Sequence, residues 1–390
     1  MFNIKRLNNI SGIVYNNLSK ENYTVSSHVE DAEADAYLVR SASCHEIEFA
    51  PTVKAIARAG AGVNNIPLDK CTEQGIVVFN TPGANANAVK ELVICAILMA
   101  SRNVIEGNRW AMTLGDEGDN ILKVIEKGKS QFVGPEIMGK TLGVIGLGAI
   151  GALVANAAEN LGMNVIGYDP MISVENAWLL SAGVKRAMVL DELLEKADYI
   201  TIHVPLLPAT KNIISYHEFS KMKDNTILLN FARNGLVDKK ALAEAFETGK
   251  VSKYVVDFPE ADILDNPKVI AVPHLGASTP ESEENCAKMA AIELRDFLET
   301  GSINNSVNMP KCILTDTNLH RVAVFHQNLP KQISQMTTIF ANEHINVSEM
   351  VNKSRGTIAY SVFDLDSVPS EEAIRAIEAI DGVVKVREIK

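Results

Sequence analysis

The stretch Gly139-Lys-Thr-Leu-Gly-Val-Ile-Gly-Leu-Gly-Ala-Ile-Gly151 places a short apolar run directly before three glycines with the spacing Gly-x-Gly-x-x-Gly. The apolar run predicts a strand over residues 142–145, and the apolar segment after the glycines predicts a helix. In such a strand–turn–helix unit, Gly146 makes the tight turn, Gly148 lets the backbone approach a pyrophosphate and Gly151 lets the helix pack on the strand. The free N–H groups at the start of the helix would attract that anion. We therefore predict a dinucleotide-binding unit.

An acidic residue lies at a position that affects whether the site binds NAD or NADP. The next predicted strand, residues 164–168, ends at Asp169, 23 residues after Gly146. A carboxylate there accepts from both ribose hydroxyls and repels a 2′-phosphate. Because no arginine directly follows Asp169, we predict NAD as the cofactor.

Bulk composition excludes several classes of partner. The chain has 390 residues, a formal net charge of −11, and 47% hydrophobic residues, which is enough for sizeable cores. An acidic chain without a basic cluster favours neither nucleic acid nor an anionic membrane. The five cysteines are scattered without a metal-binding spacing, as reduced thiols are. From this spacing we expect no metal site. Since the N-terminus lacks the apolar core of a signal peptide, we expect a cytoplasmic protein.

Apolar, β-branched runs alternate with helix-length segments through the first 275 residues. This alternation predicts βαβ units with parallel sheets, arranged as two α/β lobes. The predicted strands are residues 36–39, 55–57, 76–79, 142–145, 164–168, 199–204, 226–229, 254–256 and 269–272.

After a polar linker at residues 301–310, the pattern repeats on a smaller scale. Strands are predicted at 321–325, 345–350, 357–365 and 383–389, with helices at 331–343 and 370–380. The order βαββαβ is typical of a ferredoxin-like module. The predicted fold class is therefore α/β, with two Rossmann- or flavodoxin-like parallel-sheet lobes and a small C-terminal α+β domain.

Three polar side chains follow predicted strands, where open α/β sheets bind ligands. Arg233 follows strand 226–229, Glu260 follows strand 254–256 and His274 follows strand 269–272. Hydride transfer from a 2-hydroxy acid needs a base for the hydroxyl proton, a cation for the carboxylate and an acid that orients the base. His274, Arg233 and Glu260 fit these roles. Each alone is more often structural, but together they favour catalysis.

The glycine stretch, His203-Val-Pro205, Ala232-Arg233-Asn-Gly-Leu-Val-Asp238 and His274-Leu-Gly-Ala-Ser278 resemble the D-isomer-specific 2-hydroxyacid dehydrogenase family. The resemblance covers essentially the whole chain, and its C-terminal module resembles an ACT domain. It implies a substrate-binding domain at residues 1–98 completed by 280–303, an NAD-binding Rossmann domain at 99–279 and an ACT-like regulatory domain at 314–390.

The resemblance also implies which residues contact NAD and which are catalytic. The catalytic residues would be Arg233, Glu260 and His274. The NAD-binding residues would be Gly146, Gly148, Ala149, Ile150, Gly151, Asp169, His203, Val204, Pro205, Phe231, Ala232, Arg233, Asp257, His274, Gly276 and Ala277.

Two departures from the family pattern bear on these assignments. Arg233-Asn-Gly stands where the family usually has Arg-Gly-Gly. The acidic segment Asp257-Phe-Pro-Glu260-Ala-Asp262 is shorter than usual. Ungapped counting makes Asp262 the catalytic acid, whereas residue type makes it Glu260. We assign Glu260 and keep Asp262 as the alternative.

Extra cations in the first lobe predict a phosphorylated 2-hydroxy acid as substrate. The substrate-binding residues implied by the resemblance are Arg40, Ser41, Arg58, Gly60, Gly62 and Asn85. The resemblance implies oxidation of 3-phospho-D-glycerate to 3-phosphooxypyruvate, the first step of L-serine biosynthesis, as the expected reaction. The alternatives are a glyoxylate or hydroxypyruvate reductase, and a non-catalytic NAD-sensing protein.

The C-terminal module resembles an effector-binding domain. His326, Asn328 and Asn346 match positions at which ACT domains bind serine between paired modules, which implies L-serine as effector and a homo-oligomer, a dimer or tetramer. The family usually has glycine after Pro330, whereas this chain has Lys331. That departure leaves a dimerisation module without a ligand as the alternative.

Overall fold

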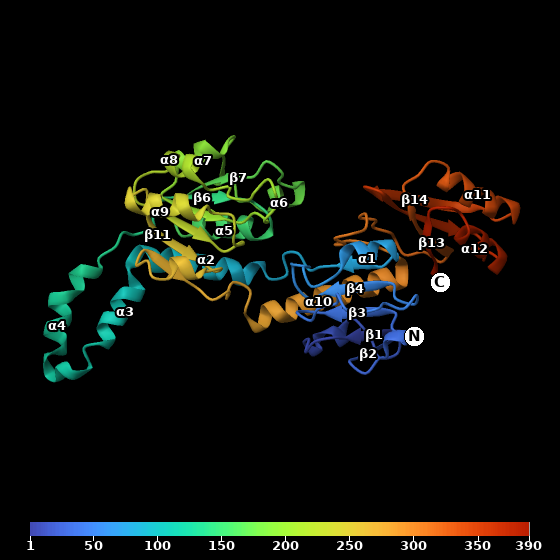
Figure 1. Ribbon diagram of the computed structural model, residues 1–390, viewed down its shortest axis with the longest axis horizontal. Coiled ribbons are helices and arrows are strands. Elements are labelled where there is room, and N and C mark those ends of the chain that lie inside the picture. The colour runs from blue at the N-terminus through green and yellow to red at the C-terminus, as the bar shows by residue number, and fades with distance from the viewer. Residues whose placement is uncertain (390) are drawn as a thin grey trace. The chain divides into compact units, whose positions relative to one another are not determined.

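The computed structural model describes residues 1–389 and divides the chain into two units, which we describe separately (Figure 1). The first unit combines residues 1–85 with the described residues from 283 onward, and the second consists of residues 86–282. Among the described residues, no helix is both long and apolar enough to cross a membrane. The domain boundaries given above remain predictions.

A sheet of seven parallel strands forms the centre of the second unit, in the order β12-β11-β10-β9-β6-β7-β8. The strands are β6 Thr141–Ile145, β7 Asn164–Tyr168, β8 Lys185–Arg186, β9 Tyr199–Ile202, β10 Thr226–Asn230, β11 Val251–Val256 and β12 Val269–Ala271. The order reverses at β6, whose neighbours are β7 and β9. Such a switch point is where open α/β sheets bind ligands. The glycine turn after β6 lies there.

Helices cover both faces of this sheet. On one face, α2 (Ala86–Arg102) and α5 (Ala149–Asn160) share a core with β6 and β10. On the other face lie α7 (Leu190–Lys196), α8 (Tyr216–Lys221) and α9 (Lys239–Glu247). The short α6 spans Val174–Leu179. Burial on both faces explains why these strands are continuous apolar runs rather than alternating ones.

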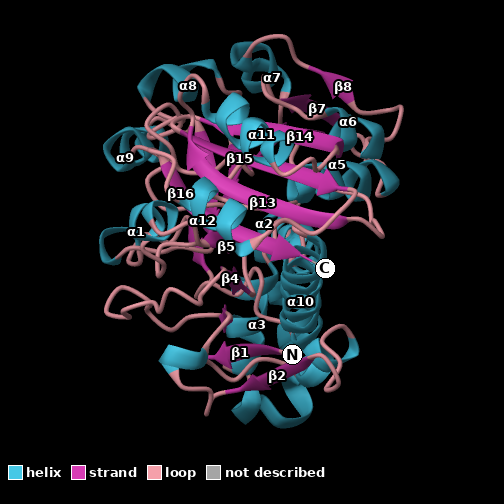
Figure 2. Cartoon of the chain, turned by 90° about the vertical axis from the view of Figure 1, so that its right-hand side faces the viewer, coloured by secondary structure: helices cyan, strands magenta, loops and turns pink. Residues whose placement is uncertain are grey.

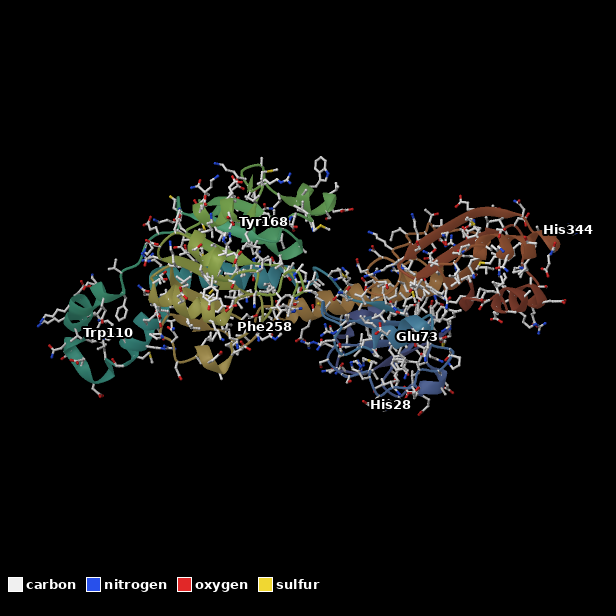
Figure 3. The ribbon with its side chains drawn as sticks, turned by 45° about the horizontal axis from the view of Figure 1, so that its top comes forward. His28, Glu73, Trp110, Tyr168, Phe258 and His344 are labelled. Carbon is white, nitrogen blue, oxygen red and sulfur yellow. The ribbon has the colours of Figure 1, made fainter. Side chains whose placement is uncertain are left out.

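Two helices, α3 (Val104–Met112) and α4 (Ile121–Gly128), extend away from the sheet of the second unit (Figure 1). The ring of Trp110 packs 5.3 Å from that of Phe132; Trp110 is labelled in Figure 3. A Cβ atom at Gly128 would overlap the Trp110 ring. The two helices therefore pack through a small residue facing a large one.

The first unit has a parallel sheet in the order β2-β1-β3-β4-β5. Its strands are β1 Phe2–Arg6, β2 Tyr23–Ser26, β3 Ala36–Val39, β4 Ala55–Arg58 and β5 Val77–Phe79, and α1 spans Leu68–Glu73. This is the flavodoxin-like order. The sequence reasoning missed β1 and β2, because only Ile4 of β1 is buried and no apolar run marks the strand.

The C-terminal module has the predicted βαββαβ order, within the first unit. Its elements are β13 His320–Gln327, α11 Gln332–Asn342, β14 Val347–Arg355, β15 Ile358–Leu365, α12 Glu371–Glu378 and β16 Val383–Ile389. The four strands are antiparallel in the order β14-β15-β13-β16. Figure 2 shows α11 and α12 over one face. Residues of the other face, including Phe325 and Tyr360, share a core with α10 (Pro280–Thr300).

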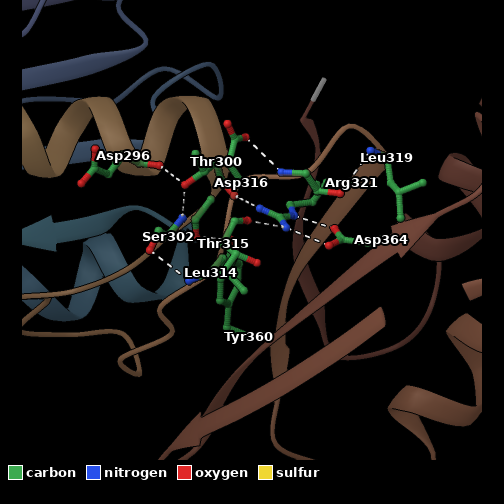
Figure 4. A network of polar contacts seen from close by, with 12 residues as sticks. Asp296, Thr300, Ser302, Leu314, Thr315, Asp316, Leu319, Arg321, Tyr360 and Asp364 are labelled. Carbon is green, nitrogen blue, oxygen red and sulfur yellow. Dashed lines mark hydrogen bonds and ion pairs between the residues drawn. The ribbon is translucent and has the colours of Figure 1, made fainter. Parts of the chain in front are cut away.

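Two buried arginines of the module bind the C-terminal end of α10. Arg321 on β13 donates two hydrogen bonds to the carboxylate of Asp364, at 2.6 and 2.8 Å, and one to the Thr300 carbonyl at 2.7 Å (Figure 4). Arg387 on β16 lies 4.3 Å from the centre of the Phe297 ring and donates to the Leu298 carbonyl. The last carbonyls of a helix have no partner within the helix. Arg321 and Arg387 of the module therefore donate hydrogen bonds to carbonyls that would otherwise lack a donor.

Lys331, the N-cap residue directly before α11, has a left-handed backbone conformation with φ +73°. This conformation costs an L-residue with a Cβ atom roughly 1–2 kcal/mol. We expect Lys331→Gly to raise the free energy of unfolding by about 1 kcal/mol, because glycine removes that steric cost but has more freedom when unfolded. Urea unfolding measures the change. Lys331→Ala keeps the Cβ atom and serves as control, and an equal gain in both variants would contradict the explanation.

Candidate active site

The three glycines of the fingerprint differ in what surrounds them. Gly146 has φ +89°, and a Cβ atom there would lie 2.8 Å from the carbonyl oxygen of His203. A Cβ atom at Gly151 would overlap the carbonyl oxygen of Gly146. At Gly148, by contrast, no atom lies within 4 Å of where a Cβ would be. The first and third glycines permit close packing of the fold, and the second leaves open space at the start of α5 for a ligand's phosphates.

The carboxylate of Asp169, the predicted ribose ligand, is hydrogen-bonded to the glycine fingerprint turn. Its Oδ2 accepts a hydrogen bond from the backbone N–H of Leu147, inside the fingerprint, and its Oδ1 accepts one from Met171, both at 2.8 Å. These bonds orient the carboxylate and leave further lone pairs on each oxygen. A pair of ribose hydroxyls fits this acceptor set.

His203 lies at the end of β9, beside the fingerprint turn. Burial lowers the pKa of its imidazole to about 3, so the ring is neutral. Its Nε2 lies 2.9 Å from the Thr201 hydroxyl, while Nδ1 is buried without a partner among the described residues. The side chain is therefore part of the packing below the turn rather than a proton carrier.

A buried asparagine shapes the turn that carries Arg233. Asn230, the last residue of β10, donates from its side-chain amide to the Arg233 carbonyl at 2.8 Å and accepts from the Ala232 N–H at 3.1 Å. The Arg233 side chain is exposed and donates to the Ala232 carbonyl at 2.7 Å. The turn is fixed, while most of the guanidinium donors remain available for an anion.

Asp257, at the end of β11, performs the same task for the turn that carries His274. Its carboxylate accepts from the N–H groups of Leu275 and Gly276, at 2.7 and 3.0 Å, and its carbonyl accepts from His274 N–H at 2.9 Å. Burial raises the pKa of the Asp257 carboxyl. His274 itself is exposed, with φ +53°. Asp257 therefore fixes the backbone that presents the imidazole.

One aromatic ring brings Arg233 and His274 together. The centre of the Phe258 ring lies 4.4 Å from that of the His274 imidazole and 5.8 Å from the Arg233 guanidinium carbon. Phe258 is labelled in Figure 3. A cation over an aromatic face is attracted to it. Arg233, a cation, and His274, a potential base, follow different strands but both pack beside the Phe258 ring.

Glu260 lies in the same unit but contacts a different side chain. The Lys239 ammonium pairs with the Glu260 carboxylate and lies 3.2 Å from that of Asp262. This hydrogen bond, with one from Asn234, lowers the pKa of the Glu260 carboxyl. Within the part of the chain that the structure describes, neither acid makes a hydrogen bond with His274. The choice between Glu260 and Asp262 therefore stays a prediction.

In the first unit, the predicted substrate-binding residues gather at the ends of β3 and β4. The Arg58 guanidinium donates to the carbonyls of Arg40, at 3.0 Å, and Gly62. Arg40 forms an ion pair of 2.6 Å with Glu283. Asn8 accepts from the N–H groups of Arg40, Ser41 and Ala42, at 2.9 to 3.0 Å. No described hydrogen bond connects Asn85 to this cluster.

Residues 94–276 match a family described as D-isomer specific 2-hydroxyacid dehydrogenase, NAD binding domain. The D-3-phosphoglycerate dehydrogenase of Haemophilus influenzae is 32% identical over 356 residues, which are 87% of this chain and 82% of the relative. The chain belongs to the D-isomer-specific 2-hydroxyacid dehydrogenase family. Another member, the D-3-phosphoglycerate dehydrogenase of Methanocaldococcus jannaschii, is 42% identical over 71% of this chain and 52% of its own length. The chain thus spans about half the length of several curated relatives.

Solved structures of the D-isomer-specific 2-hydroxyacid dehydrogenase family have the same fold. The NAD⁺-bound 3-phosphoglycerate dehydrogenase of Entamoeba histolytica is 28% identical, with a TM-score of 0.62, over 79% of this chain and 98% of that one. A glyoxylate reductase from Paecilomyes thermophila is 27% identical, with a TM-score of 0.63, over 78% and 98%. The predicted fold class is confirmed.

The structure adds residues of this family member that sequence reasoning missed. Phe258, Asn230, Lys239 and Asn8 each hold a predicted site residue in place. An asparagine at the end of the apolar run 226–229, directly before the Arg233 turn, was a usable signal for Asn230. Nothing in the sequence alone marks the other three.

The predicted effector residues of the C-terminal module differ in their exposure to solvent. His326 is buried, and its ring nitrogens already face the Gln327 carbonyl, at 2.8 Å, and the Ser361 hydroxyl, at 2.9 Å. Asn328 and Asn346 are exposed. His326 is therefore placed to order the strand, whereas the two asparagines remain accessible to a ligand.

Proposed function

We propose that the chain is an NAD-dependent oxidoreductase that converts 3-phospho-D-glycerate to 3-phosphooxypyruvate, the first step of L-serine biosynthesis. The observation that carries the proposal is the placement of Arg233 and His274 on the Phe258 ring, in the same unit as the fingerprint. The names of the curated relatives support the choice of substrate.

In the proposed reaction, Gly146–Gly151 and Asp169 would hold NAD, which would supply the acceptor for the hydride on C2 of the substrate. The His274 imidazole takes the hydroxyl proton, so that the C2–O bond becomes a carbonyl as the C2–H bond breaks. The Arg233 guanidinium binds the substrate carboxylate through paired N–H donors and polarises the C2 oxygen. Glu260 is the proposed acid that stabilises the protonated imidazole. In the opposite direction, His274 returns the proton.

Arg40 and Arg58 are the proposed ligands of the substrate's anionic groups in the first unit. Arg58 also bonds to the Arg40 and Gly62 carbonyls, so it both supplies charge and shapes the loop. Arg40 is already paired with the Glu283 carboxylate, which offsets its positive charge. Arg58 is therefore the more informative residue to test.

Initial rates with NAD decide the substrate. We expect 3-phospho-D-glycerate to give a higher kcat/KM than D-glycerate or D-lactate, and Arg58→Ala to raise the KM for the phosphorylated substrate. Faster turnover of D-glycerate, or reduction of glyoxylate in preference to 3-phosphooxypyruvate, would instead favour a reductase of unphosphorylated acids. Inactivity of the purified protein with retained NAD binding would favour an NAD-sensing protein.

Asp169→Asn tests the choice of dinucleotide. The amide keeps the shape of the side chain but removes the charge that favours ribose hydroxyls and repels a 2′-phosphate. Since a hydrogen bond to a charged group contributes about 1.5–3 kcal/mol, we expect the KM for NAD to rise by about 10- to 100-fold, with a smaller preference for NAD over NADP. Steady-state kinetics with both cofactors measure this. Asp116→Asn, at an exposed position, should leave both unchanged.

We further propose that the C-terminal module binds L-serine between paired copies of the chain. The exposed Asn328 and Asn346 support ligand access, whereas the internal bonds of His326 restrict it to ordering the site. Rate measurements against added L-serine, together with light scattering for the oligomeric state, test both parts. An unchanged rate in an oligomer would leave only the dimerisation role.

A further inference from the structure

A pocket of about 800 Å³ runs along one face of α10 within the first unit. Helix residues at positions 285, 288, 289, 292, 293, 296 and 300 form one wall, and they recur at the three- and four-residue spacing of a helix face. The opposite wall comes from Gly83 and Ala84 and from the segment after α10, at positions 302, 304, 305, 313 and 314. Much of the lining is apolar, from Met289, Ile292 and Leu314. We call this cavity the α10 pocket.

Glu293 is the unusual member of the lining. Its residue is only 5% exposed, and a carboxyl group of that burial normally has a cationic partner. Instead, its Oε1 accepts a single hydrogen bond from the Asn305 side chain, at 2.6 Å. Its Oε2 is buried without any partner among the described residues. An acceptor that lines a pocket and lacks a donor is placed to receive one from a ligand.

A second acceptor lies one helical turn away, on the same face. Arg295 donates both of its bonds to Oδ1 of Asp296, at 3.0 and 2.8 Å. The other oxygen, Oδ2, accepts no bond within the residues that the structure describes. Desolvation, and to a lesser extent the charge of Asp296, raises the pKa of Glu293 to about 8. A cation placed between the two carboxyl groups would relieve both the burial and the repulsion.

The floor of the pocket is held in place by the junction shown in Figure 4. The Thr300 hydroxyl donates to the Asp296 carbonyl at 2.6 Å and accepts from the Ser302 N–H at 3.2 Å. The Ser302 hydroxyl accepts from the Leu314 N–H at 3.2 Å. These bonds connect the last turn of α10 to the linker. The cavity is thus bounded by bonded elements on two sides.

We propose that the α10 pocket binds a small ligand with a primary ammonium group and an apolar body. The ammonium would donate to Glu293 Oε2 and Asp296 Oδ2, and the body would contact the apolar lining. Lys288 also lines the pocket and is exposed. Its positive charge would attract an anionic ligand. An anionic ligand is therefore the alternative that the test must exclude.

Calorimetric titration of the full chain with butylammonium tests the proposal. Butanol has the same tail without the charge, and butyrate has the opposite charge. We expect saturable binding of butylammonium alone. Because a carboxyl of pKa about 8 is mostly protonated at pH 7, binding should release close to one proton, measured by comparing buffers of different ionisation enthalpy.

Glu293→Gln keeps the size of the side chain but cannot ionise. We expect it to fold normally, to bind butylammonium at least about tenfold more weakly and to release no proton. The matched control is Glu284→Gln, on the same helix but outside the pocket lining, which should bind like the wild type. Equal binding by Glu293→Gln, preferential binding of butyrate, or no saturable binding by the wild type would each overturn the proposal.

Discussion

Replacement of His274 by asparagine is expected to lower kcat by about 10²- to 10⁴-fold, the usual contribution of a positioned general base. Asparagine is the appropriate substitution because His274 has φ +53°, and asparagine tolerates that left-handed conformation better than most residues. The backbone turn, with its bonds from Leu275 and Gly276 to Asp257, should therefore persist. Initial rates with NAD and 3-phospho-D-glycerate measure the loss.

The control is the same substitution at another exposed histidine of the same unit. The His217 imidazole lies 3.2 Å from the Asp191 carboxylate, and His217→Asn should retain wild-type kcat. NAD binding, followed by fluorescence or calorimetry, should be unchanged in both variants. If His274→Asn kept more than about a tenth of the wild-type kcat, His274 would not be the base.

Replacement of Arg321 by methionine is expected to reduce the free energy of unfolding by about 3–5 kcal/mol, because it leaves a buried charge without its partner. Asp364 is 5% exposed and Arg321 is 3% exposed. The carbonyls of Thr300 and Thr315 also lose their donors, from 2.7 and 3.1 Å. Urea unfolding of the full chain, followed by circular dichroism, measures the change.

The double variant Arg321→Met with Asp364→Leu separates the effect of the uncompensated charge from that of the lost hydrogen bonds to the Thr300 and Thr315 carbonyls. Apolar replacement of both partners removes the uncompensated carboxylate, so we expect it to be more stable than Arg321→Met alone. Arg375→Met changes the same residue type at an exposed position, with Glu371 3.9 Å away, and should alter stability by less than about 0.5 kcal/mol. A double variant no more stable than the single one would show that the carbonyl bonds dominate.

Local sequence patterns were sufficient for most of the fold. Strands β9 and β10 are buried along their whole length, so each stands out as an apolar run. The fingerprint turn was equally clear, because Gly146 requires a positive φ and Gly151 a close approach. Strand β1 was missed for the opposite reason, since one buried residue in five leaves no periodic signal. Prediction succeeded where burial or backbone geometry restricts residue type.

The sequence by itself therefore determined the dinucleotide fingerprint, the two parallel sheets, the ferredoxin-like module and the strand ends that carry Arg233 and His274. Only the tertiary structure decided which side chains meet there. In that structure the Phe258 ring packs beside Arg233 and His274. Glu260 forms an ion pair with Lys239. The tertiary structure also left Glu293 buried without a cation. Local patterns specify which way a chain segment faces, whereas the partner of a polar side chain comes from a distant segment and depends on how the elements pack.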